Sequence, residues 1–203
     1  MRKWIITGIL LVAVVLVLWN TVGGLQENSM TKPQLSVLNQ ILSDKVTEEQ
    51  VQTIKLQGSV AQKFPAVDKM FKVVAKEESY VFLVSPVGYR SPINTMVVVI
   101  AEKNDITGIK VMQHDETPGW GEWLTETWFA DRFKGKKVDK YLERAILEAK
   151  KDNEIIQITS ATISTQAVIN GVNSAMGVYR EVVLGQKSEG VPLKVEGFIT
   201  ESQ

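Results

Sequence analysis

The sequence lacks cysteine altogether and has a single histidine, His114. Disulfides, thiol nucleophiles and cysteine-ligated iron–sulfur clusters are therefore excluded, since each of them needs thiol sulfur. With only one imidazole, a histidine-rich zinc or haem site is not expected either. Any redox chemistry in this chain must then rely on an organic cofactor, and we expect no metal site.

The chain also lacks an excess of charge of either sign, because its 203 residues include 23 Lys or Arg and 23 Asp or Glu. Nucleic-acid-binding surfaces normally need a basic excess, so we expect no nucleic-acid partner. We find no internal repeat and no low-complexity segment.

One long N-terminal segment lacks charge entirely. Residues 4–19 are uncharged, and Trp4 and Trp19 stand at the two ends of this run. A helix over residues 4–22 would be about 28 Å long, enough to cross the hydrocarbon core of a bilayer. Tryptophans are typical of the two membrane interfaces.

A cleaved signal peptide is the alternative interpretation of this run. However, residues 21–23 make a poor cleavage site, and the run is longer than a usual signal core. The sequence therefore predicts an N-terminal transmembrane helix within residues 1–24. Because Arg2 and Lys3 precede the run, we expect them in the cytoplasm and residues 25–203 in one compact extracytoplasmic domain at the cell membrane.

Patterns of apolar residues predict an α+β fold, with a small antiparallel sheet packed with helices. Runs of β-branched residues predict strands at residues 80–84, 95–101, 106–114 and 154–158. A tight turn joins the second and third of these strands and favours antiparallel pairing. Helical spacing predicts helices at residues 33–43, 66–76, 122–133, 140–150 and 165–184, the last stopped by Gly185.

Aromatic residues recur at helical spacing in residues 122–133. Such a stripe is more typical of a core than of a cofactor contact. We therefore expect Trp123, Trp128 and Phe133 to be mainly buried.

Hydroxyl side chains cluster between the last predicted strand and the last predicted helix, in residues 159–165. The simpler interpretation is that they cap the helix, since Ser and Thr oxygens accept hydrogen bonds from first-turn amides. The alternative is an anion site, because the same amides and the helix dipole favour a phosphate.

A second unusual segment, residues 116–121, follows a predicted strand. Pro118, Gly119 and Gly121 force a turn with exposed backbone amides. Such a turn can simply connect a strand to a helix, or it can let the backbone approach a planar or anionic ligand.

Together the two segments resemble the covalent-FMN-binding domain found in the G subunit of the Rnf electron-transport complex and the C subunit of the sodium-pumping NADH:quinone reductase. The family's Glu-Thr-Pro-Gly-x-Gly signature is matched at residues 116–121. Its Ser/Thr-Gly-Ala-Thr signature, followed by an apolar residue and more hydroxyls, is matched at residues 159–165. The resemblance extends over the predicted anchor and over residues 108–111 and 128–136.

This resemblance implies that FMN is joined to Thr162 by a phosphoester, and that a separate flavin transferase attaches it. Ser164 and Thr165 are the alternative acceptors. The resemblance also implies that Glu116, Thr117 and the turn amides around Gly119 cradle the isoalloxazine, with Lys134 and Lys136 as weak phosphate partners. Further cofactor-binding residues would be Ser160, Ala161, Ser164 and Thr165. Two positions depart from the family pattern: Ser160 stands in place of glycine, and Ile156 in place of an acidic residue.

The implied function is that of a membrane-anchored electron-carrier subunit of a Rnf-type, ion-translocating ferredoxin:NAD oxidoreductase. Its partners would be polytopic membrane subunits. One alternative is a non-catalytic, membrane-tethered assembly or binding domain whose flavin site has decayed. Another is a stand-alone flavinylated carrier for extracellular electron transfer.

Overall fold

The computed structural model describes residues 29–195. The predicted transmembrane helix within residues 1–24 lies outside these residues. Within residues 29–195, the helices are either too short or too polar to cross a bilayer.

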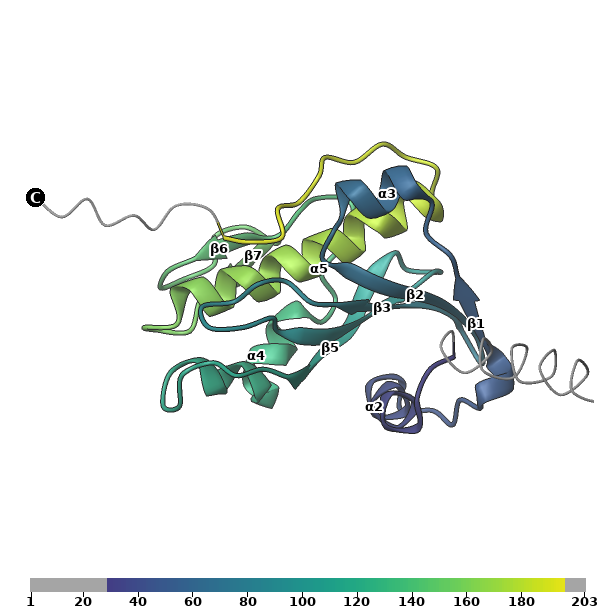
Figure 1. Cartoon of the computed structure of the whole chain (residues 1–203), viewed down its shortest axis with the longest axis horizontal. Helices are drawn as coiled ribbons and strands as arrows, with labels where there is room; N and C mark the ends of the chain where they lie inside the picture. The colour runs from purple at the N-terminus through teal and green to yellow at the C-terminus, as the bar shows by residue number, and fades with distance from the viewer. Residues whose placement is uncertain (1–28, 196–203) are drawn as a thin grey trace, which may run out of the picture.

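A five-stranded antiparallel sheet forms the centre of the α+β fold (Figure 1). Each strand pairs with the next in the chain, in the order β1 (Val51–Ile54), β2 (Val67–Val74), β3 (Glu78–Val84), β4 (Asn94–Ile100) and β5 (Asp105–Gln113). The three strands predicted at residues 80–84, 95–101 and 106–114 are confirmed, and β4 and β5 pair antiparallel as expected.

Helices cover both faces of this sheet (Figure 1). The long helix α5 (Thr162–Val182) packs on one face, and α2 (Lys32–Leu42) packs on the other. Because neighbouring strand residues point to opposite faces, Phe82 lies in the core under α5, whereas Val81 lies in the core under α2. Burial on both faces explains why β3 and β4 are continuous apolar runs.

Smaller elements complete the domain around these layers. The helix predicted at residues 33–43 is confirmed as α2, with its apolar Leu38 buried. A single turn of 3-10 helix, η1 (Glu48–Gln50), precedes β1, and the short helix α3 (Gly58–Lys63) follows β1. The strand predicted at residues 154–158 is present in shorter form as β7 (Glu154–Ile156).

The helix predicted at residues 66–76 is wrong, since this segment is strand β2. Its apolar residues have helical spacing because they serve two cores. Met70 is buried on the α5 side of the sheet, and its neighbour Phe71 is buried on the α2 side. A central strand between two cores therefore lacks the alternation that identifies a half-exposed strand.

The single helix predicted at residues 122–133 is also wrong. The chain forms three short pieces there, and the extended backbone at Glu126 (φ −69°, ψ 142°) separates the first piece from the other two. Phe133 is fully buried as expected, but Trp123 and Trp128 are 45% and 41% exposed, so their assignment to the core is wrong. The three pieces are η2 (Gly121–Thr125), α4 (Thr127–Ala130) and η3 (Asp131–Phe133).

Each of the two exposed tryptophans makes a polar contact at the surface. The indole Nε1 of Trp123 donates to the carbonyl of Gly119 at 3.1 Å. The guanidinium of Arg132 lies 4.6 Å from the centre of the Trp128 ring. These two contacts fix the positions of the rings at the surface, although neither ring is buried in the core.

The helix predicted at residues 140–150 is replaced by the short strand β6 (Glu143–Ala145), which pairs parallel with β7. The side chain of Asn173 on α5 bonds both backbone groups of Leu142, at 2.7 and 2.9 Å, and so fixes an extended entry to β6. Leu142 and Ala145 are buried in this extended form, whereas Leu147 is 86% exposed.

Candidate functional site

The beginning of α5 and the turn after β5 form the two sides of one pocket of about 480 Å³. This volume lies in the range of small-molecule and cofactor sites. The two segments that the sequence singled out, far apart in the chain, therefore meet in space. The pocket is lined by Tyr89, Thr117, Trp120, Gly121, Ser160, Ala161, Thr162, Ile163 and Ser164.

Thr162 is the first residue of α5 and one of the lining residues. The helix begins three residues earlier than predicted, with Ala161 at the N-cap. Ala161 has no side-chain oxygen and no side chain caps this end, so the capping interpretation of the hydroxyl cluster is wrong. The first-turn amides of an α-helix have no partner within the helix, and here they begin at the pocket.

The other hydroxyls of α5's first turn have partners. The hydroxyl of Ser164 donates to the carboxylate of Glu116. The hydroxyl oxygen of Thr165, which is fully buried, accepts from the backbone N–H of Ile158 at 3.1 Å. By contrast, the half-buried Thr162 hydroxyl makes no hydrogen bond to any of residues 29–195.

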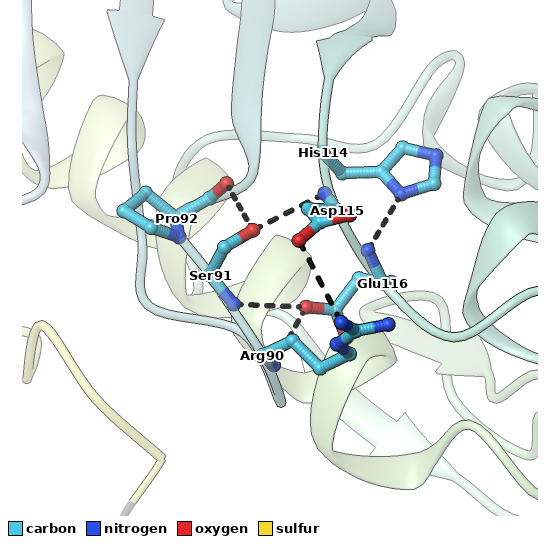
Figure 2. A network of polar contacts seen from close by, with 6 residues as sticks. All are labelled: Arg90, Ser91, Pro92, His114, Asp115 and Glu116. Atoms are coloured by element: carbon cyan, nitrogen blue, oxygen red, sulfur yellow. Dashed lines mark hydrogen bonds and ion pairs between the residues drawn. The ribbon is translucent and has the colours of Figure 1, made fainter.

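Glu116 is buried, and Figure 2 shows its carboxylate beside the backbone of Arg90 and Ser91. The backbone N–H groups of Tyr89, Arg90 and Ser91 donate to it at 3.1, 3.0 and 3.4 Å. With the hydroxyl of Ser164, four donors satisfy this carboxylate, as a buried charge requires. Glu116 does not line the pocket, but it contacts the three segments that do, at Tyr89, Gly121 and Ser164.

Two glycines make room for the buried carboxylate. A Cβ at Gly88 would lie 2.6 Å from a Glu116 oxygen, and a Cβ at Gly121 would lie 2.5 Å from the Glu116 Cβ. Both approaches are closer than any side chain allows. Gly121, which the sequence analysis treated only as part of the turn, is therefore a close-contact position at the pocket wall.

The turn itself is closed by its own backbone. The carbonyl of Thr117 accepts from the N–H groups of Trp120 and Gly121, at 3.2 and 2.9 Å. Gly119 has φ +77°, a conformation that favours glycine, and a Cβ there would meet only open space. Gly119 thus shapes the turn, but it is not among the residues that line the pocket.

The two lysines proposed as weak phosphate partners lie at a different cavity, along the loop that follows η3. The ammonium of Lys134 pairs with Asp131 at 2.6 Å. The ammonium of Lys136 donates to the carbonyls of Asp152 and Glu154. Both groups are engaged away from Thr162, so the structure does not bring them to the pocket.

Comparison with known proteins agrees with this geometry. Residues 88–177 match the family described as the FMN-binding domain. The predicted resemblance is confirmed. Every residue that lines the pocket lies inside the matched segment.

Curated relatives carry related names. The chain is 33% identical over 113 residues to the G subunit of the ion-translocating oxidoreductase complex of Methanosarcina acetivorans, covering 56% of this chain and 55% of that protein. It is 34% identical over 96 residues to the G subunit of the Na⁺-translocating ferredoxin:NAD⁺ oxidoreductase complex of Acetobacterium woodii, covering 47% and 45%. The chain thus spans about half the length of these relatives.

The fold is similar to that of a solved structure. The crystal structure of the C subunit of the Na⁺-translocating NADH-quinone reductase from Parabacteroides distasonis matches with a TM-score of 0.54. The match covers 76% of this chain and 98% of that chain, at 17% identity. At this identity the similarity establishes the fold alone.

Sequence reasoning assigned no contact to four of the lining residues, Tyr89, Trp120, Gly121 and Ile163. The last three stood inside the two quoted segments. Tyr89 had no local signal beyond the turn residues around it, because its place at the pocket depends on a contact with Glu116, which is 27 positions away.

Proposed function

We propose that the chain is the FMN-bearing electron-carrier subunit of an ion-translocating oxidoreductase complex. The pocket at the start of α5 supports this, because it joins both motifs of an FMN-binding domain. The names of the curated relatives support the assignment to a multi-subunit complex. FMN bound there would accept and release electrons, while the chain would supply its position and surroundings.

Thr162 is the residue that we propose to carry FMN, through a phosphoester at its hydroxyl oxygen. The observation that carries this proposal is the contrast within one helical turn: the Ser164 and Thr165 hydroxyls are engaged in hydrogen bonds, and the Thr162 hydroxyl is free among the described residues and lines the pocket. A phosphate on this oxygen would lie at the N-terminus of a 21-residue helix, where amides and the helix dipole favour negative charge.

The pocket offers no base for this attachment. None of its nine lining residues carries a carboxylate, an imidazole or an amine. A threonine hydroxyl needs such a group to become a nucleophile. We therefore propose that a separate flavin transferase forms the bond.

Placement at the membrane is the remaining part of the proposal. The uncharged run of residues 4–19 would anchor the chain, and residues 25–203 would face away from the cytoplasm beside polytopic subunits. Because the chain has no cysteine, Lys187→Cys introduces a single exposed thiol. A membrane-impermeant maleimide should label it in intact cells, and labelling only after lysis would reverse the orientation.

The covalent link is tested on denaturing gels after production beside a flavin transferase. The wild-type band and the Thr162→Ser band should fluoresce, because both keep the hydroxyl, and Thr162→Ala should be dark. Thr159→Ala is the matched control, since it removes an exposed hydroxyl of the same cluster. A fluorescent Thr162→Ala with a dark Ser164→Ala or Thr165→Ala would move the acceptor. A dark wild type would favour the non-catalytic assembly domain.

A further inference from the structure

Two large aromatic side chains line the pocket and are nevertheless open to solvent. Tyr89 is 66% exposed and Trp120 is 51% exposed. Exposed aromatic side chains that gather at one concave site mark a binding surface more often than chance. Aromatic rings contact planar rings favourably in offset-stacked or edge-to-face arrangements.

Glu116 is connected to both aromatic residues, to Tyr89 through its carboxylate and to the neighbour of Trp120 through its Cβ. Glu116 accepts from the amide of Tyr89 itself and from the two amides that follow it. On its other side, the Cβ of Glu116 lies against Gly121, the neighbour of Trp120. The same carboxylate accepts from Ser164 on α5, two residues after Thr162.

This connection is specific to a carboxylate. A carboxylate offers acceptors only, and here both oxygens face donors: one accepts from Arg90 and Ser91, the other from Tyr89 and Ser164. A glutamine of the same shape would turn its NH₂ group toward one of these two donor pairs. Replacing Glu116 by glutamine should therefore release one connection while keeping the volume of the side chain.

We propose that Tyr89 and Trp120 contact the isoalloxazine ring, and that Glu116 is a positioning residue that holds both of them relative to Thr162. This inference rests on the proposed function, because it concerns the ring of the group attached at Thr162. Glu116 itself contacts the protein and acts on the ring only through the two aromatic side chains.

The test uses the flavinylated full chain and compares flavin fluorescence before and after denaturation. Tyr and Trp side chains in contact with a flavin quench its emission, so native wild type should be dim and should brighten on unfolding. Tyr89→Leu and Trp120→Leu should each lose part of this quenching, and Tyr89→Trp should restore it. Trp128→Leu is the matched control, because Trp128 is a comparably exposed tryptophan that does not line the pocket and contacts Arg132 instead.

The positioning role is tested by Glu116→Gln against Glu154→Gln. Glu154 also accepts from two loop amides, those of Lys150 and Lys151, but it lies away from the pocket. Glu116→Gln should reduce the native quenching and shift the visible circular dichroism of the flavin, whereas Glu154→Gln should leave both unchanged. Unchanged signals in Tyr89→Leu and Trp120→Leu, or a Glu116→Gln effect confined to the melting temperature, would overturn the inference. Since Tyr89 is exposed, its variants should fold even if Glu116→Gln does not. Wild type without flavin would instead refute the proposed function, and this inference with it.

Discussion

Gly121 and Gly119 lie two residues apart in one turn, and the structure predicts opposite reasons for their being glycine. A Cβ at Gly121 would lie 2.5 Å from the Cβ of Glu116 and 3.3 Å from its Cγ. Favourable carbon–carbon contacts lie at about 3.5–4.0 Å, so the overlap is about 1 Å. Because the Cβ of Glu116 is fixed to its backbone, it cannot rotate away, and the two segments must separate.

The expected cost of Gly121→Ala is that of inserting one methyl group into a packed contact, about 1–3 kcal/mol. For a chain of this size, each kcal/mol lowers the melting temperature by about 2–4 °C. Gly119→Ala should cost about 1–2 kcal/mol for another reason, since its φ of +77° strains any residue with a Cβ. A Cβ there meets nothing, so the pocket should keep its shape.

Hydrogen exchange separates these two causes, because stability alone does not. Gly121→Ala should accelerate exchange of the Tyr89, Arg90 and Ser91 amides, which donate to Glu116. Gly119→Ala should leave exchange of these three amides as in wild type at matched stability. Asparagine tolerates positive φ, so Gly119→Asn should recover part of the lost stability. Normal protection of these amides in Gly121→Ala would refute the close-contact argument.

Two further predictions concern stability. Phe129→Ala should lower the free energy of unfolding, measured in urea, by about 3–5 kcal/mol, because Phe129 is fully buried. Trp123→Ala should lower it much less, because Trp123 is 45% exposed. Equal losses would contradict the assignment of the two rings. Burial raises the pKa of Tyr179 to about 12, and its hydroxyl donates to Asn104 at 2.7 Å. The folded state therefore keeps this proton after the unfolded state has lost it. Tyr179 should therefore lower the free energy of unfolding between pH 10 and 12, by at most about 1.4 kcal/mol per pH unit. Tyr179→Phe should remove this share, whereas Tyr80 and Tyr141, whose pKa values burial also raises, should keep theirs.

The sequence identified elements whose partners matter little for their conformation. Strands β3 and β4 are apolar runs rich in β-branched and aromatic residues, and α5 is long and strongly patterned, so local preference and tertiary structure agree there. The segment at residues 140–150 shows the opposite case. Its residues favour a helix, but Asn173 holds Leu142 in an extended conformation, and pairing of β6 with β7 follows. No local pattern contains that information.

The same distinction holds for the candidate site. The motif residues carry local signals, because hydroxyls before a helix and glycines in a turn have conformational meaning by themselves. Tyr89 carries none, since it reaches the pocket only through amides that bond a carboxylate in a distant segment. The role of Glu116 was equally hidden, because its burial depends on two glycines, Gly88 and Gly121, that approach it from different loops.

Ser160, one of the two departures from the resembled motif, has a conformational explanation. Its φ is +65°, a region that glycine reaches without strain and that costs other residues about 1–2 kcal/mol. Glycine at this position in the motif would thus serve the backbone path into α5, and serine adopts the same path at a cost in stability. Ser160→Gly removes this strain but adds freedom to the unfolded chain, which offsets about 0.5–1 kcal/mol. We expect a net gain of about 0.5–1 kcal/mol in the free energy of unfolding. The proposed flavin attachment at Thr162 should occur equally in both forms, because the backbone path that presents its hydroxyl is the same. A lower melting temperature for Ser160→Gly would mean that the serine side chain makes a stabilising contact that outweighs the strain.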